Sequence, residues 1–219
     1  AELYIGKKRM CVCRYPSMGK DVVIKEVIRH ETDPAHHVIL RLDDEEYKTW
    51  GSYNDIFLCG FFRFDWSYGL SRLNGVTENG LVDAGPHDYA GGGHFYFYNV
   101  FDELSQPGEY CIDRENKLLY VYKTDNFETA QIQLSCCPET PLVLENVNYF
   151  TFRGFTIEGT RGKIAMIKGD HIIFDRNHIL MGMHLMDMTG KYCIFSNNHV
   201  EQMGGRGIFL YSGSYDTLE

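Results

Sequence analysis

Apolar and polar positions alternate in three short segments of the last third of the chain, and the segments recur at a nearly constant spacing. They begin at Phe150, Ile172 and Cys193, and each is eight residues long. When the segments are stacked, Phe152, Phe174 and Phe195 align at intervals of 22 and 21 residues. The same two intervals separate Ile157, Ile179 and Val200. A period near 22 residues is typical of a coil in which short parallel strands stack rung on rung.

Alternation within a segment predicts which side chains face the inside of this coil, because successive side chains of a strand point to opposite faces. It places Ile172 and Phe174 inside, and Ile173 and Asp175 on the outer face. We therefore expect Asp175 to be accessible from the surface.

Asparagine follows this strand in two successive rungs, at Asn177 and Asn198. Amides stacked at equivalent bends can pass hydrogen bonds from rung to rung, which satisfies backbone groups that lack a ladder partner. Leucine-rich repeats share the approximate period, but their spaced leucine consensus is missing here. The pattern over residues 146–213 predicts a right-handed parallel β-helix.

Before about residue 140 the period disappears, and short strand-like runs separated by turns remain. The runs are 22–28, 38–42, 56–64, 95–100, 118–122 and 130–134. Pro138 and Pro141 mark the transition to the coil. The sequence thus predicts an all-β fold, with a β-rich, sandwich-like inserted domain in residues 1–137 and the first rungs of the β-helix in residues 138–219.

Composition agrees with this fold class and excludes some partners. The 219 residues are 44% hydrophobic, and the 22 glycines, 15 tyrosines and 14 phenylalanines suit short strands with tight turns. A net charge of −9 repels nucleic-acid phosphates, so we expect no nucleic-acid partner. No run approaches the roughly 18 apolar residues of a membrane-spanning helix, so we expect no membrane span.

The seven cysteines form an odd set without a C-x-x-C pair, which indicates reduced core thiols and neither a disulfide framework nor a zinc ribbon. Asp83, His87, Asp88 and His94 surround a run of three glycines, but their spacing matches no standard metal site. We therefore predict no metal and no cofactor. No signal peptide is visible, and both a secreted and a cytoplasmic location stay open.

Several motifs occur in an order that resembles a known group of proteins. They are Arg14-Tyr15-Pro16, Gly60-Phe61-Phe62-Arg63-Phe64-Asp65-Trp66, Pro107-Gly108-Glu109-Tyr110-Cys111-Ile112-Asp113-Arg114, Leu118-Leu119-Tyr120-Val121-Tyr122 and Phe152-Arg153-Gly154-Phe155-Thr156-Ile157. The order resembles bacterial right-handed parallel β-helix proteins related to the α-L-fucosidase and xylanase family of glycoside hydrolases. The resemblance spans nearly the whole chain, and its motifs specify the architecture better than the substrate.

The resemblance implies a β-rich domain built into the coil, with many more rungs after it. The chain would then be an internal fragment, completed by rungs from its parent chain or from a companion chain, and its partner would be an oligo- or polysaccharide. Glycoside hydrolysis is the activity implied first. A polysaccharide lyase or epimerase of the same fold is an alternative, and so is a non-catalytic glycan-binding or structural solenoid.

Hydrolysis requires two carboxylates about 5 Å apart for retention, or about 6.5–9.5 Å apart for inversion. Adjacent rungs lie about 4.8 Å apart, so two acids stacked in one column would suit a retaining enzyme. The column of Asp175 carries Arg153 and Ser196. The column of Asp187 is expected to carry Met166 and Leu210. Neither column stacks two acids, so part of the chemistry is expected in rungs beyond this chain.

Asp187 and Asp175 are the catalytic candidates that remain. If apolar neighbours bury Asp187, desolvation would raise the pKa of its carboxyl group; a local register shift would instead place it outside. His184 lies three residues earlier and is a candidate ligand contact or a plain surface residue.

A lyase instead needs a cation to neutralise a uronate and a base to remove a proton. Arg153, His178, His199 and Arg206 are possible suppliers, and His178 and His199 share one column. Surface histidines beside the asparagine bend are the alternative interpretation.

In the first domain, Asp65 and Trp66 pair an acid with a ring of the kind that stacks on sugars. A buried tryptophan beside a turn-capping aspartate is the alternative there. The predicted substrate contacts are therefore Asp65, Trp66, His178, His184, His199 and Arg206.

Overall fold

The computed structural model describes residues 2–29, 38–43, 50–51, 54–77, 80–205, 207–214 and 216–218. Within these residues the regular structure is β-strand, apart from the short 3-10 helix η2 (Phe101–Glu103), so the all-β prediction is confirmed. Among them, no helix is long and apolar enough to cross a membrane. The chain divides into two compact units, one of Ala1–Met10 with Asn126–Glu219 and the other of Cys11–Asp125.

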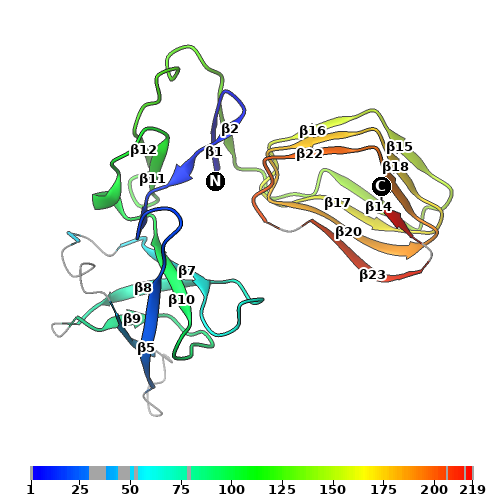
Figure 1. The fold of residues 1–219 in the computed structure, drawn as a ribbon. Helices are drawn as coiled ribbons and strands as arrows, with labels where there is room; N and C mark the ends of the chain where they lie inside the picture. Colours follow the sequence, from blue (N-terminus) through cyan, green and yellow to red (C-terminus); the bar gives the residue numbers. More distant parts are fainter. Residues whose placement is uncertain are drawn as a thin grey trace. The chain divides into compact units, whose positions relative to one another are not determined.

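The first unit contains a parallel β-solenoid with three sheets. One sheet consists of β14 (Leu142–Glu145), β17 (Lys163–Lys168), β20 (His184–Lys191) and β23 (Ile208–Ser214). The second consists of β15 (Thr151–Arg153), β18 (Ile173–Asp175), β21 (Ile194–Ser196) and β24 (Thr217–Leu218), and the third of β16 (Thr156–Glu158), β19 (His178–Leu180) and β22 (His199–Glu201). Figure 1 shows these sheets as three sides of a coil whose successive turns change from yellow to red. The predicted parallel β-helix is confirmed.

Register in the solenoid follows the repeat found in the sequence. Phe152 pairs with Phe174, which in turn pairs with Phe195. Their rings stack inside the coil with centroids 5.0 and 5.6 Å apart and planes within 14°. Phe174 and Ile172 are fully buried, as predicted. Burial of one such side chain stabilises the fold by about 1.5–3 kcal/mol.

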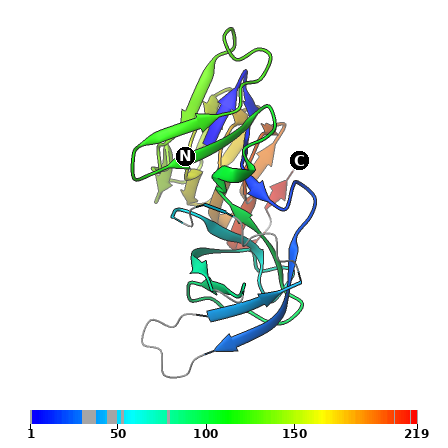
Figure 2. The same ribbon diagram turned by 90° about the vertical axis from the view of Figure 1, so that its left-hand side faces the viewer.

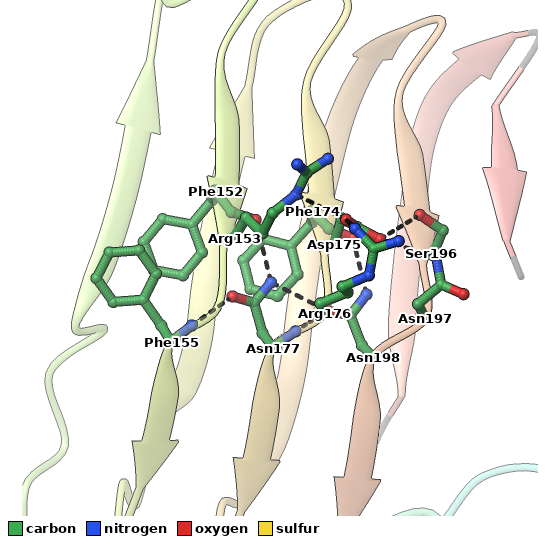
Figure 3. Close-up of polar contacts among 10 residues, drawn as sticks. All are labelled: Phe152, Arg153, Phe155, Phe174, Asp175, Arg176, Asn177, Ser196, Asn197 and Asn198. Atoms are coloured by element: carbon green, nitrogen blue, oxygen red, sulfur yellow. Dashed lines mark hydrogen bonds and ion pairs between the residues drawn. The ribbon is translucent and has the colours of Figure 1, made fainter.

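At the bend after the second sheet, a residue with left-handed backbone is followed by an asparagine in two of the three rungs. Gly154, Arg176 and Asn197 occupy equivalent positions with φ values of 76°, 53° and 54°. In the next position, Asn177 donates from Nδ2 to the Asn198 side-chain oxygen at 3.0 Å. Asn198 donates in turn to the Phe174 carbonyl at 2.8 Å (Figure 3). The predicted rung-to-rung amide contacts are confirmed.

The first unit also contains a three-stranded antiparallel sheet, in which β1 (Glu2–Ile5) lies between β13 (Ile132–Ser135) and β2 (Lys8–Arg9). Tyr4 of β1 packs against Leu180 and Met181 of the solenoid. The chain's first strand therefore packs with the coil. The sequence division at residue 137 stays a prediction.

The second unit is built around a sheet that closes on itself. The strand order is β4 (Arg14–Tyr15), β10 (His94–Tyr98), β5 (Val22–Arg29), β6 (Val38–Leu42), β9 (Val82–Ala84), β8 (Gly69–Val76) and β7 (Phe57–Phe61), and β7 also pairs with β10. Figure 2 shows β5 and β6 running side by side, and their register is antiparallel. A Cβ at Gly60 would lie 2.5 Å from the Phe95 Cα atom, so the closing contact between β7 and β10 requires glycine there.

Apolar side chains fill this closed sheet, including Leu40, Leu58, Val82, Phe95 and Phe97, each with no exposed surface. A small sheet of β12 (Leu118–Val121), β11 (Glu109–Asp113) and β3 (Cys11–Val12) completes the unit. The seven cysteines are free thiols, and the prediction that they lie in the core is wrong for Cys136 and Cys137, which are exposed, and for Cys11, which is half-buried. Four of them, Cys13, Cys59, Cys111 and Cys193, are buried, and burial raises the pKa of Cys59 to about 12.

Candidate functional site

Asp187 lies on the outer face of the sheet formed by β14, β17, β20 and β23. It pairs in register with Met166 on one side and Phe209 on the other. Its carboxylate contacts the ammonium group of Lys163, and its side chain keeps 20% of its surface exposed. The structure therefore places Asp187 in an outward-facing ion pair.

The sequence alignment of this column with Leu210 was wrong, because Leu210 pairs with Met188. The register of β20 and β23 is irregular between Thr189 and Lys191. Strand β23 contains one extra residue at this point. A spacing taken from residues after the irregularity is therefore one residue longer than the true spacing before it, and it pairs Asp187 with Leu210 in place of Phe209. Phe209, with an exposed ring, is its true neighbour.

Two exposed rings complete what we call the lysine–aspartate face, defined by Lys163, Asp187, Phe209 and Tyr211. His184, another predicted site residue, pairs in register with Lys163, and its ring lies against Gly205. It is three residues from Asp187, so alternation along the strand does not place it on this face. Phe209 and Tyr211 are exposed, with ring centroids 5.3 Å apart. Sequence reasoning missed both rings, although their spacing of two residues places them on one face of a strand.

Asp175, the other catalytic candidate, is covered by the residues that it contacts. The expectation that it is accessible from the surface is therefore wrong. One carboxylate oxygen accepts from Ser196 at 3.1 Å and from Asn197 at 2.9 Å. The other contacts Arg153 at 2.7 Å and Arg176 at 3.1 Å (Figure 3). Only 5% of the side chain is exposed.

The alternation rule placed Asp175 on the outer face but could not show that long neighbours fold over it. The hydrogen bond from Asn197, helped by Ser196 and the two arginines, lowers the pKa of its carboxyl group. All four acceptor positions are used, so the geometry favours a role in joining the coils. The same contact occupies Arg153, one of the residues considered for lyase chemistry.

His178 and His199 share one column of the third sheet, as predicted. Both rings reach Glu201, a residue that sequence reasoning did not select. His178 Nε2 lies 3.0 Å from one carboxylate oxygen of Glu201, and His199 Nε2 lies 3.6 Å from the other. Arg206, the remaining candidate nearby in the sequence, lies outside the described residues.

A ladder of rings at another bend also escaped the sequence analysis. Tyr149, His171 and Tyr192 stack with centroids 4.4 and 4.8 Å apart and planes within 9°. They follow the same intervals of 22 and 21 residues as the core phenylalanines, so the repeat could have identified them. Tyr149 is strongly exposed, which leaves one ring face of this ladder accessible.

In the second unit, Trp66 is on the surface, with 81% of the residue exposed. It stacks on Phe64 with centroids 5.3 Å apart and planes at 12°. Of the two alternatives for Trp66, the buried one is therefore wrong. Exposed apolar rings of this size are typical of binding surfaces.

Asp65, beside Trp66, belongs to a chain of polar contacts with His94 at its centre. His94 Nδ1 lies 2.9 Å from a carboxylate oxygen of Asp21, and Nε2 lies 3.4 Å from one of Asp65. The hydrogen bond with Asp21 is the largest cause of a raised pKa of His94, with a smaller contribution from Asp65 against the opposing effect of burial. The ring therefore gains a proton more readily than an ordinary histidine.

Asp83 and Asp88, which the sequence groups with His94 as possible metal ligands, each contact a different residue. Asp88 pairs with Arg63 at 2.8 Å, and Asp83 accepts a hydrogen bond from Asn74 at 3.1 Å.

A cavity of about 390 Å³ in the same unit is lined by Asp55, Asp102, Asp113, Glu115, Phe101 and Tyr120, among others. Acids and rings together suit polar, ring-shaped ligands, and no motif in the sequence predicted this cavity.

Comparison with known proteins supports the fold. No protein-family model matches the sequence, and no curated protein matches it. A solved structure titled "Glycoside hydrolase" superposes with a TM-score of 0.66 at 12% sequence identity. The match covers 89% of this chain and 46% of that structure, so the chain spans about half the length of the protein it matches. At this identity the likeness shows the fold.

Proposed function

We propose that this chain is part of a carbohydrate-active β-helix enzyme, a glycoside hydrolase that acts on a complex glycan or polysaccharide. The observation that carries the proposal is the fold likeness to a glycoside hydrolase over 89% of the chain. Because a fold alone does not establish an activity, the proposal also needs surfaces that suit sugars.

The lysine–aspartate face supplies one such surface. Asp187 presents a carboxylate next to the exposed ring of Phe209, and Tyr211 adds a second ring. Aromatic faces stack on the apolar faces of sugar rings, and contact with the Lys163 ammonium group suits an ionised carboxylate. We assign Asp187 the role of nucleophile or general base, and the aromatic residues the role of holding the sugar.

The ring pair of Trp66 and Phe64 is the second surface, and we propose that it also binds glycan. Asp65 and His94 would supply hydrogen bonds to hydroxyl groups beside these rings. His184, whose ring lies against Gly205, would be a further substrate contact.

The test is to incubate the full-length protein with a panel of glycans and to follow both new reducing ends and the absorbance of unsaturated uronates. We expect reducing ends without that absorbance. Asp187→Asn should lower kcat by about 10²–10⁴-fold, the range for loss of a positioned acid or base. Glu145→Gln is the matched control, since Glu145 forms an exposed ion pair with Lys168 on the same sheet.

Unsaturated products would instead support a polysaccharide lyase. Binding without any product would support a glycan-binding or structural solenoid. Equal activity of Asp187→Asn and Glu145→Gln would remove Asp187 from the reaction.

A further inference from the structure

Three potential metal ligands lie together on the third sheet of the solenoid, in what we call the His–Glu cluster: His178, His199 and Glu201. The parallel register of β19 and β22 places His178 beside His199 and Leu180 beside Glu201. The two imidazole rings have centroids 4.9 Å apart and are inclined at 64°. Because side chains two residues apart share one face of a strand, His199 and Glu201 point to the same side.

Distances within the cluster match those in a metal centre. The Glu201 carboxylate oxygens lie 3.0 Å from His178 Nε2 and 3.6 Å from His199 Nε2. One potential ligand atom from each of the three residues lies within 4.8 Å of the other two. In a tetrahedral zinc site with bonds of about 2.0–2.1 Å, neighbouring ligand atoms are about 3.4 Å apart. The two measured distances, 3.0 and 3.6 Å, lie on either side of that value.

We propose that the His–Glu cluster binds a divalent transition metal ion of the zinc class. Two imidazole nitrogens and one carboxylate suit Zn²⁺ and its neighbours Co²⁺ and Ni²⁺, whereas Ca²⁺ and Mg²⁺ prefer sites built of oxygen atoms. The proposal does not depend on any carbohydrate activity.

The exposure of the cluster decides what kind of site it makes. The side chains of His178, His199 and Glu201 keep 43%, 68% and 44% of their surface exposed. Three protein ligands with solvent access leave at least one coordination position for water or for an oxygen of a bound molecule. The ion would also join two successive coils, because its ligands come from β19 and β22.

Zn²⁺ binding to the full chain, first stripped with a chelator, can be measured by competition with a chromophoric chelator. We expect one equivalent bound at this site, with visible d–d absorption when Co²⁺ replaces Zn²⁺. His178→Ala, His199→Ala and Glu201→Gln should each weaken binding about tenfold or more. Glu158→Gln is the matched control, because Glu158 lies in the same column as Glu201, two coils away, and should bind Zn²⁺ like the wild type.

A thermal readout separates this site from loss of folding. Without metal, the variants of His178, His199 and Glu201 should have the Tm of the wild type, because these side chains are exposed. Added Zn²⁺ should raise the Tm of the wild type and of the Glu158→Gln control, but not that of the three cluster variants. Equal Zn²⁺ affinity in the wild type and in the His178→Ala/His199→Ala double variant would overturn the proposal, as would the absence of binding to the wild type.

Discussion

The guanidinium Nε of Arg153 lies 2.7 Å from the carboxylate of Asp175, which belongs to the next coil of the solenoid. The same carboxylate accepts a hydrogen bond from Ser196, one coil further on. One side chain therefore holds three consecutive coils together at their outer face. Asp175, which the sequence offers as a catalytic candidate, therefore links successive coils in the structure.

Asp175→Asn should destabilise the solenoid in a way that depends on pH. Because the folded protein lowers the pKa of this carboxyl group, its contribution is complete above the ordinary aspartate value of about 3.9 and is lost as the pH falls through the lower folded value. Urea unfolding should show a lower midpoint for the variant at pH 7 and a smaller difference from wild type below about pH 4. A difference that does not change with pH would contradict the assignment.

Asn177→Ala should cost about 1–3 kcal/mol of unfolding free energy, since it leaves part-buried backbone groups without their side-chain partner. Its side-chain oxygen accepts from the Phe155 amide at 3.0 Å, and its Nδ2 donates to the Phe152 carbonyl at 3.1 Å. A double-mutant cycle with Asn198→Ala, measured by urea unfolding, should reveal coupling between the two amides. Additive effects would mean that the contact between the side chains contributes nothing.

Phe174→Ala should cost about 3–5 kcal/mol, because it opens a cavity in the middle of the phenylalanine stack. Phe174 has no exposed surface and is stacked on both faces. Phe150→Ala is the control, since Phe150 is 39% exposed and should lose far less. Comparable losses of unfolding free energy in the two variants would argue against the stacked core.

Trp66→Ala should weaken the retardation of the protein in gels that contain the glycan it cleaves, because one of the two proposed sugar-binding surfaces loses its exposed ring. The fold should be unaffected, because Trp66 is largely exposed. Met18→Ala removes another exposed apolar side chain of the same unit and should leave retardation unchanged. Unaltered retardation of Trp66→Ala would exclude this surface from glycan binding.

His94 should titrate above the ordinary histidine pKa of about 6.5, owing first to Asp21 and then to Asp65. The charged ring stabilises the folded state fully below about pH 6.5, and this contribution is lost as the pH rises through the higher folded pKa. A titration followed by NMR, with His94→Gln to assign the signal, should show the higher midpoint. Asp21→Asn should lower that midpoint more than Asp65→Asn, and the reverse order would contradict the assigned cause.

Sequence alone determined the architecture of the coil and much of its register. Parallel strands in register place residues one period apart beside each other, so the spacing of Phe152, Phe174 and Phe195 was sufficient. The contact between Asn177 and Asn198 followed for the same reason. Both predictions use only local periodicity, so they do not depend on the conformations of long side chains.

Only the tertiary structure decided which side chains meet on the outer face. The contact between Lys163 and Asp187 depends on the reach of a flexible side chain across strands, and the pairing of Asp187 with Phe209 depends on an irregular register. Glu201 meets His178 because it projects on the same face as His199, one strand away. Periodicity assigns a residue to a column and a face, whereas partners and burial depend on side-chain length and packing in three dimensions.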